Sequence, residues 1–439
     1  MPRPPGGKMM PGTSSCRAYV EAALAARADK AQCSLAETEK SLMSFEGGSV
    51  SLFKTSKDIT GELTGIFSGR QGKISVSGEP AADIASVAVE LAASAASSQP
   101  DPANDISPGR EPGAFSSGPE RPDTDGMYGR LQEFLATVKE RWPEIGFRTS
   151  WLAFVNDSRS FANSNGMALT ARTGRYELLS LFCAKKDGRT SSFNLFIGSS
   201  RDLARPLLEW GGLERLLSDS VALTQARKLG EKFQGEIILS PEGLTEVLRH
   251  FAEELSDTRM ISGNSSYKGK LGQAIAPEIF TLLSSPRSPE LASGDLLTRD
   301  GFETEDLVLV EKGILKNYLL SGYGAAKTGF PHKPSSGGCF SVLPGETAFP
   351  DLVRSVKKGL LVTVLAGAAP NGNGDFSGIA KNSFYIEDGK ILFPISDAGV
   401  SGNLREMLAG LSGISRERVN TGDAVLPWTK FGGVNISGI

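Results

Sequence analysis

The sequence predicts an α+β fold with an N-terminal domain of helices packed on an antiparallel sheet and a C-terminal β-rich domain with a curled, barrel-like sheet. The first observation is length, because 439 residues are many for one hydrophobic core. The second is the order helix, strands, helix and hairpins before residue 230, which is typical of helices on an antiparallel sheet. The third is a series of short strands between glycine turns after residue 231. We therefore expect domains at 16–230 and 231–439, after a disordered segment 1–15.

The first part of the N-terminal domain is predicted to contain two helices with strands between them. Residues 16–28 are alanine-rich with apolar residues at helical spacing, and residues 81–97 place Ile84 and Leu91 on one helical face. Between these helices, polar and apolar residues alternate, which favours half-buried antiparallel strands. The strands are expected at 49–53, 61–68 and 73–77.

The second part of this domain begins with a long connection. Residues 99–126 are rich in Pro, Asp, Gly and Ser without periodicity, so we expect a surface-hugging or partly disordered loop that tolerates shortening at 102–119. A helix at 127–142 follows. Turns at Asn165-Gly166 and Asp187-Gly188 indicate an antiparallel meander. Its strands are expected at 147–156, 160–170, 173–185 and 190–199, before a broken helix at 203–228.

The C-terminal domain opens with a strand at 235–239 and a helix at 241–255, for which Ser240 is the N-cap. Asp388-Gly389 between two β-type runs predicts a type I′ hairpin, and Pro394 places its second strand at an edge. A later helix is expected to begin at Asn403, with Glu406 completing a capping box. Further strands are expected at 272–276, 279–284, 307–311, 314–320 and 360–365.

The composition excludes several classes of protein. Hydrophobic residues make up 39% and charged residues 22% of the chain, as in an ordinary globular protein. A net charge of −3 leaves no surplus of positive charge for phosphates, so we expect no nucleic-acid partner. No apolar run reaches the ~20 residues of a membrane span, and the first residues lack the apolar core of a secretory signal. We expect a cytoplasmic protein with no membrane partner and with Cys16, Cys33, Cys183 and Cys339 as free thiols.

Motifs spread over the chain resemble one known family. The clearest are Gly-Asp-Phe-Ser-Gly at 374–378, the Asp388-Gly389 hairpin, and Gly-Val-Ser-Gly-Asn-Leu-Arg-Glu-Met at 399–407. Further matching stretches are 270–273, 300–304, 310–320 and 432–438. Together they resemble the TldD/PmbA (TldE) family, the so-called modulators of DNA gyrase. The similarity is clearest after residue 240 and weakest before residue 100.

The resemblance implies a place to look for a catalytic metal. Proteolytic members of the family carry an H-E-x-x-x-H run, and a zinc-protease helix uses such histidines as ligands beside a glutamate base. The corresponding letters here are Thr245-Glu246-Val-Leu-Arg-His250, so Thr245 replaces the first histidine. The cysteine-bearing stretch near the end of those members is also missing, because no cysteine follows Cys339. We interpret Glu246 and His250 as a degenerate remnant and assign no catalytic residue or metal ligand.

Two other readings of His250 stay open at this point. A surface pair with Glu254, four residues later on the helix, is the plain explanation. A metal site built from His250, His332 and Cys339 is the other, although no close spacing supports it.

Two glycine-rich stretches are candidates for binding a peptide or a partner protein. At 371–378 the glycines let backbones approach closely, and an extended peptide would bind there through backbone hydrogen bonds. The candidate residues are Asn373, Asp375, Phe376, Ser377, Asn403 and, in the second stretch, Lys327. Asn403 begins a helix whose first amides suit an anion or a carbonyl. The plain alternatives are a tight turn at 371–378 and a solvated lysine at 327.

The resemblance implies a non-catalytic, PmbA/TldE-like subunit of a TldD/TldE-type heterodimeric zinc peptidase that cleaves unfolded peptides. This chain would form part of the proteolytic chamber and hold no cofactor, and zinc is expected in a TldD-like catalytic partner. One alternative is a self-sufficient metallopeptidase with a degenerate zinc site. The other is a gyrase-modulating binding protein, against which the acidic charge balance argues.

Overall fold

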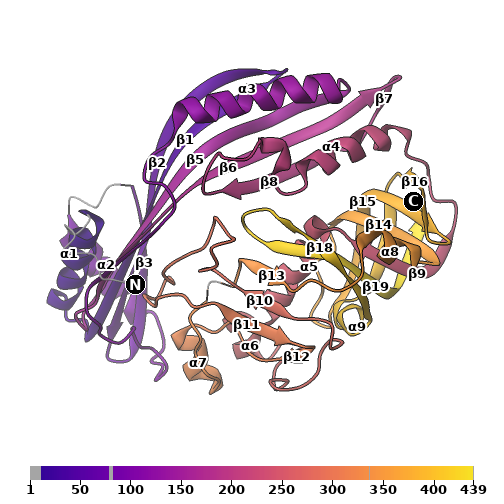
Figure 1. Ribbon diagram of the computed structural model, residues 1–439. Helices are drawn as coiled ribbons and strands as arrows, with labels where there is room; N and C mark the ends of the chain where they lie inside the picture. The colour runs from indigo at the N-terminus through magenta and orange to yellow at the C-terminus, as the bar shows by residue number, and fades with distance from the viewer. Residues whose placement is uncertain (1–10, 79–82, 336, 439) are drawn as a thin grey trace.

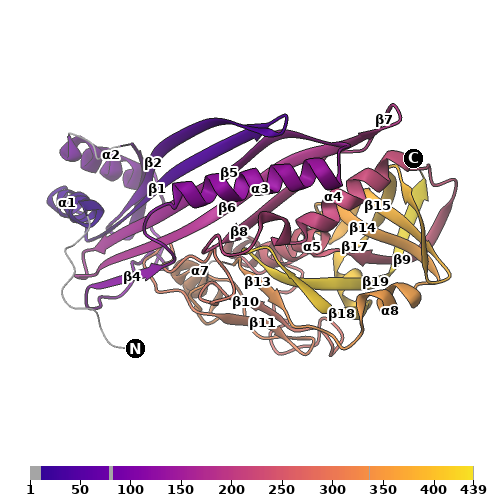
Figure 2. The same ribbon diagram turned by 45° about the horizontal axis from the view of Figure 1, so that its top comes forward.

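The computed structural model describes residues 11–78, 83–335 and 337–438. It is a mixed α/β structure with two large β-sheets, one on each side of residue 230 in the sequence. Figure 1 shows the N-terminal sheet arching above the C-terminal sheet, and Figure 2 shows how long its strands are. No helix in the described part of the chain is long and apolar enough to cross a membrane.

The N-terminal sheet is a curled half-barrel whose long strands all pair in antiparallel fashion. Its strand order is β3-β2-β1-β5-β6, and the short strands β4, β7 and β8 all pair with β6. The strands are β1 (Lys30–Glu46), β2 (Ser49–Phe67), β3 (Arg70–Ser77), β4 (Gly113–Ser117), β5 (Ile145–Asn163), β6 (Ala168–Lys186), β7 (Arg189–Thr190) and β8 (Asn194–Ser200).

Four helices cover one face of this sheet. They are α1 (Pro11–Ala25), α2 (Ile84–Ala96), α3 (Thr124–Arg141) and α4 (Leu213–Ala222). The helices α1 and α2 bury Cys33 at one end of β1, whereas α3 and α4 bury Phe45 at its other end. Cys33 and Phe45 share a face because they lie an even number of residues apart on one strand. The opposite face is covered at one end, where Leu296 and Leu297 pack on Phe161.

In the N-terminal half, the predicted start of the first helix and several predicted strand boundaries were wrong. The first helix begins at Pro11, so residues 11–15 are not disordered; residues 1–10, and 81–82 of the second predicted helix, lie outside the described residues. The strands predicted between 147 and 185 merge into β5 and β6, because the Asn165-Gly166 turn is the one reversal that the long ladder contains. The strands predicted at 49–53 and 61–68 likewise form one strand, β2.

The long connection is also more ordered than predicted. Residues 113–117 form β4, which pairs with β6 in parallel, and Ile106 and Ser107 of the same connection are buried. A parallel partner more than fifty residues away leaves no local alternation for sequence reasoning to find. The broken helix predicted at 203–228 reduces to α4 with short 3₁₀ turns on either side.

Five strands of the C-terminal sheet close into a barrel. They pair in the ring β9-β14-β15-β17-β19, and β19 pairs back to β9. The curled, barrel-like sheet was predicted, but the closure of the ring by the pairing of β19 with β9 was not. The barrel strands are β9 (Lys232–Leu239), β14 (Lys358–Ala366), β15 (Asp375–Glu387), β17 (Ala398–Asn403) and β19 (Val425–Gly438). The strands outside the ring are β10 (Leu282–Ser284), β11 (Leu307–Glu311), β12 (Ile314–Leu315), β13 (Phe340–Val342), β16 (Lys390–Ile395) and β18 (Leu411–Asn420).

Local signals in this half are largely confirmed. Asp388 and Gly389 both have positive φ, at 45° and 74°, in the turn between β15 and β16. Pro394 lies on β16, which pairs with β15 alone among the described strands and is therefore an edge strand. The prediction of a strand at 272–276 is wrong, because the segment makes a single bridge, from Ala274 to Ile314. The C-terminal helices are α5 (Pro241–Glu254), α6 (Asp257–Ser262), α7 (Gly322–Thr328), α8 (Phe349–Arg354) and α9 (Leu404–Ala409).

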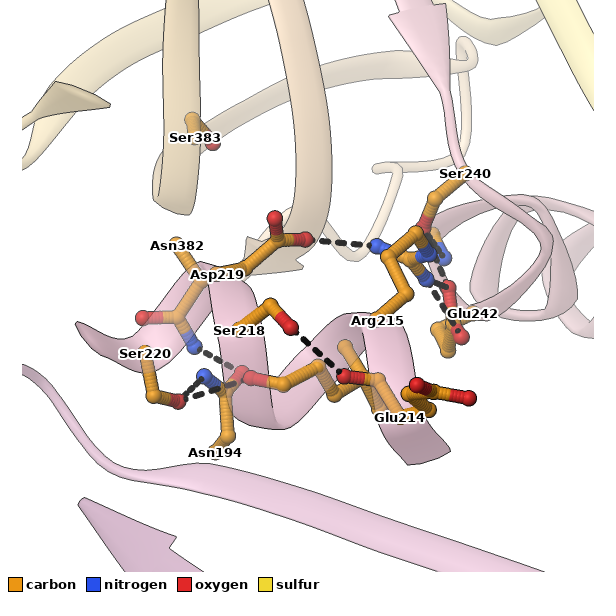
Figure 3. Close-up of polar contacts among 12 residues, drawn as sticks. Asn194, Glu214, Arg215, Ser218, Asp219, Ser220, Ser240, Glu242, Asn382 and Ser383 are labelled. Carbon is orange, nitrogen blue, oxygen red and sulfur yellow. Dashed lines mark hydrogen bonds and ion pairs between the residues drawn. The ribbon is translucent and has the colours of Figure 1, made fainter. Parts of the chain in front are cut away.

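A polar network joins α4 of the N-terminal half to α5 and to the barrel (Figure 3). Arg215 on α4 donates to both carboxylate oxygens of Glu242 in the first turn of α5, each at 2.8 Å, and to Asp219 at 2.9 Å. Asn382 on β15 donates to Asn194 at 2.6 Å, which in turn donates to Ser220 at 2.6 Å. These contacts fix the start of α5 relative to the N-terminal sheet.

Candidate functional site

Helix α5 carries Thr245, Glu246 and His250, the segment that we interpret from the sequence as a degenerate remnant, and the helix sequence explains how this segment is held. The Ser240 hydroxyl accepts from the amide of Gly243, which confirms the predicted N-cap. The apolar stripe that includes Leu244, Val247 and Phe251 is buried and packs with residues of β9 and β14. Glu246 and His250 lie beside this stripe, so the barrel core sets their positions.

The side chains of the remnant form hydrogen bonds and ion pairs with each other and with neighbouring groups of the same helix. His250 Nε2 lies 3.4 Å from Glu246 Oε1, and Arg249 donates to Glu246 at 2.6 Å. The Thr245 hydroxyl donates to the carbonyl of Pro241 at 2.9 Å, as a helical threonine commonly does. The predicted surface pair of His250 with Glu254 is wrong.

Glu254 does not form this surface pair because its side chain is buried. Glu254 is 8% exposed and accepts from the backbone amide of Ser266 at 2.8 Å, so it points into the core and not along the helix surface. The side chain of His250 is only 16% exposed and borders an open hollow of 540 Å³ together with Leu319 and Ser335.

The loop 371–378 comes close to the remnant. Phe376 is buried and shares a small apolar enclosure with Glu246, His250 and Leu404. The two stretches that the sequence singled out separately are therefore parts of one place in the fold. This meeting depends on the pairing of β9 with β14 and of β14 with β15, since α5 follows β9 and Phe376 lies on β15.

The same loop is locked by its own side chains. The Asn371 side-chain oxygen accepts from the amides of Asn373 and Asp375, at 2.9 Å and 3.0 Å. Asn403 donates to the carbonyl of Asn373 at 3.0 Å and to the carboxylate of Asp375 at 2.8 Å. Gly374 has a φ of +87°, which favours glycine at this turn.

Asn403 also caps α9, as predicted. Its side-chain oxygen accepts from the amides of Arg405 and Glu406, at 3.0 Å and 3.4 Å. These amides are thus already occupied by the cap. Ser377 is exposed on β15 opposite Ser401 of β17.

Lys327 lies apart from the other candidates, on α7, which Figure 1 places away from α9. Its ammonium group lies 3.0 Å from the carboxylate of Asp101, to which the Tyr323 hydroxyl also donates at 2.9 Å. This hydrogen bond with Asp101 raises the pKa of Lys327. Lys327 therefore connects α7 to the long loop of the N-terminal half.

Two further residues complete the set that the sequence left open. The ring of His332 packs edge-on against Phe302, with centroids 4.4 Å apart. The Cys339 thiol donates to the carbonyl of Ser293 at 2.9 Å, and burial together with Asp423 raises its pKa to about 12. A thiol held neutral in this way is a poor metal ligand. All four cysteines are unpaired, as expected.

The donors near α5 do not fit a catalytic zinc. Such a site needs three protein ligands around one open position. Within residues 11–78, 83–335 and 337–438, no three His, Cys, Asp or Glu side chains group in a way that could hold a metal ion. Only His250 supplies an imidazole next to Glu246, and Thr245 uses its hydroxyl within the helix.

Sequence reasoning missed Arg405. This side chain donates to the carbonyl of Asn373 at 2.6 Å and so clasps the loop from the first turn of α9. Its signal was an arginine two residues after a capping asparagine and close to a glycine-rich loop. The Arg215 network was missed as well, although Arg215 and Asp219 stand at helical i, i+4 spacing.

The chain is similar in sequence to known proteins. Residues 233–438 match the family described as PmbA/TldA metallopeptidase C-terminal domain. The chain is 27% identical over 284 residues to a protein named metalloprotease PmbA homolog from Haemophilus influenzae. It is 25% identical over 283 residues to one named metalloprotease PmbA from Escherichia coli O157:H7. Each alignment covers 62% of this chain and 62% of the relative's length.

Solved structures share the fold. TldE from Thermococcus kodakarensis superposes with a TM-score of 0.79 at 20% sequence identity. The superposition covers 97% of this chain and 100% of that one.

Proposed function

The chain belongs to the PmbA/TldD metallopeptidase family, and on this premise we propose that it is a non-catalytic, TldE-like subunit of a two-subunit zinc peptidase. Its partner would be a TldD-like catalytic subunit that holds the zinc ion. The substrates would be unfolded peptides, which enter a chamber formed by both subunits. In this arrangement the present chain shapes and narrows the chamber.

The observation that carries the proposal is the donor set on α5. Thr245 stands where a ligating histidine is needed, and its hydroxyl is bonded within the helix. Glu246, the residue in the position of a general base, is held by Arg249 and by His250. A subunit that needs the fold but not the chemistry could lose metal ligands in this way, because the packing of α5 on the barrel does not depend on them.

An exposed apolar row supports the existence of a partner. In register across the N-terminal sheet, Ser44 pairs with both Leu52 and Trp151, and Leu179 pairs with both Trp151 and Ile197. Directly paired residues point to the same face, which here is the face opposite the helices. Leu52 is 54% exposed and Ile197 49%, and beside Ile197 on the edge strand β8, Leu195 is 52% exposed.

An exposed row of this kind, apolar apart from Ser44, is typical of a protein–protein interface. Five strands at a spacing of ~4.8 Å make the row roughly 20 Å wide, which is the scale of a subunit contact and not of one bound side chain. We assign the row to the catalytic subunit, since that is the partner which the missing donor set requires.

The loop 371–378 is the proposed peptide-facing wall. Phe376 packs against the remnant while Ser377 stays exposed on the neighbouring position of β15. Asn373, Asp375 and Asn403 hold the wall rigid through their mutual hydrogen bonds. Lys327 is proposed as a partner contact beside α7, with its charge already balanced by Asp101.

Metal content and stoichiometry test the proposal. We expect no zinc in the chain purified alone and one zinc ion per one-to-one complex with a TldD-like protein, as measured by mass spectrometry of the metal and by light scattering. His250→Ala should leave peptidase activity of the complex within a few-fold of wild type. One zinc ion per chain when purified alone would instead establish the second candidate, a self-sufficient metallopeptidase, which the names of the PmbA relatives favour.

A further inference from the structure

A second hollow, of 590 Å³, lies beside α9 on the C-terminal half. It is bordered by α9 and its cap on one side and by residues 267–277 on the other. It adjoins the proposed peptide-facing wall, because Asn403 also lines it. Its lining combines two cations, one buried hydroxyl and a short apolar wall.

The cations are Lys270 and Arg405. Neither forms an ion pair with a carboxylate anywhere among the described residues, and the single carboxylate that lines the hollow is Glu406. Arg405 is held in place by its bond to the carbonyl of Asn373 at 2.6 Å, which uses one of its five N–H groups. The remaining donors and the Lys270 ammonium are available to an anion.

The buried hydroxyl belongs to Tyr267. The residue is 2% exposed and lines the hollow, yet its hydroxyl has no hydrogen-bond partner among the described residues. Its ring packs edge-on against Phe251, with centroids 5.0 Å apart, so the hydroxyl cannot swing out to another acceptor. Burial raises the pKa of Tyr267, which keeps the group a neutral donor. Buried donors are almost always satisfied, so an acceptor is expected here.

The apolar wall is rigid. Ile275 donates its amide to the carbonyl of Gly313 at 2.8 Å, and Ala274 bridges to Ile314. Gly313 has a φ of +78°, and a Cβ there would come within 2.1 Å of the carbonyl oxygen of Ala276. The hollow is therefore shaped by backbone that cannot easily relax.

We propose that this hollow binds a peptide through a glutamate or aspartate side chain, with an adjacent apolar residue against Ile275 and Pro277. The carboxylate would accept from Lys270, Arg405 and the Tyr267 hydroxyl, all three of which belong to residues that line the hollow. A neutral amide side chain would lose the charge-assisted bonds to both cations. The inference deepens the proposed function, on which it rests for the source of the peptide, and makes acidic segments the preferred class.

The test is fluorescence anisotropy with two labelled octapeptides that differ only in a central Leu-Glu or Leu-Gln pair. We expect the glutamate peptide to bind the wild-type chain at least about tenfold more tightly than the glutamine peptide. Lys270→Met combined with Arg405→Met should remove this preference. Lys268→Met is the matched control, because Lys268 is exposed two residues away and does not line the hollow.

Tyr267→Phe separates binding from folding. Loss of an unpartnered hydroxyl should leave the unfolding midpoint unchanged or higher, while affinity for the glutamate peptide falls about three- to tenfold. Equal affinity for the two peptides, no binding of either at millimolar concentration, or full affinity in the Lys270 and Arg405 double variant would each overturn the proposal. The assay uses the chain alone and reads neither zinc nor proteolysis, so its result is independent of the test of the proposed function.

Discussion

At the scale of single residues, the most consequential side chain outside the candidate site is Arg215. Its guanidinium is only 25% exposed and faces Glu242 and Asp219, whose side chains are 21% and 23% exposed. A partly buried ion pair of this kind contributes little net stability, yet the loss of one partner leaves the other charges uncompensated. Because Glu242 stands in the first turn of α5, the state of this network bears on the position of Glu246 and His250.

Arg215→Met should lower the free energy of unfolding by about 3 kcal/mol, since the two carboxylates would stay in a poorly hydrated place. Urea denaturation followed by circular dichroism measures the change. Arg249→Met is the matched control, because its guanidinium is 68% exposed and its loss should change the free energy by no more than about 0.5 kcal/mol. Equal small effects in the two variants would contradict the role given to Arg215.

At the scale of elements, the long connection 99–126 behaves as part of the sheet. Asn163 donates to the carbonyl of Ser107 at 2.8 Å, and β4 adds five residues to the ladder of β6. The expectation that 102–119 tolerates shortening is therefore replaced by its opposite, because shortening would remove the buried Ile106 or expose the edge of β6.

Hydrogen exchange tests this without altering the chain. A peptide covering 110–119 should exchange at least about a hundredfold more slowly than an unstructured segment, because the amides of β4 that face β6 are bonded. The Gly47-Gly48 turn in the peptide covering 47–54 is the internal control, and its amides should exchange quickly because they lie outside the β1–β2 ladder. Fast exchange in both peptides would restore the loop interpretation.

Whether a feature could be predicted from the sequence depends on how far apart in the chain its interacting residues lie. Ser240 as an N-cap and Asp388-Gly389 as a turn depend on neighbours within a few residues, and both are confirmed. The pairing of β4 and the contact of Phe376 with His250 depend on segments far apart in the chain, and neither was predicted. The predicted pair of His250 with Glu254 was wrong because helical periodicity gives the position of a side chain on the helix but not its hydrogen-bond partner.

At the scale of the whole molecule, we propose that the chain divides near residue 230 into two domains. Strands β1 to β8 pair only among themselves in the described ladders, as do β9 to β19. The connections between the halves include side-chain contacts, such as Lys327 with Asp101 and Ser199 with Asp423, and backbone hydrogen bonds, such as the Ser199 amide to the carbonyl of Thr421 at 2.7 Å. These polar contacts leave the apolar row of the N-terminal sheet uncovered in the single chain.

The combined change Leu195→Ser and Ile197→Ser tests whether that row meets the catalytic subunit. Both side chains point away from the core, so the unfolding midpoint of the chain alone should stay near that of wild type. The dissociation constant of the complex should rise about a hundredfold, as expected when central apolar contacts of an interface are truncated. Ile391→Ser with Leu392→Ser is the matched control, because these residues are 43% and 49% exposed on the barrel's edge strand β16. Size-exclusion chromatography with light scattering measures complex formation by the two double variants. An intact complex with the Leu195 and Ile197 variant would place the partner elsewhere, and equal loss with both pairs would mean that general surface hydrophobicity, not this row, drives association.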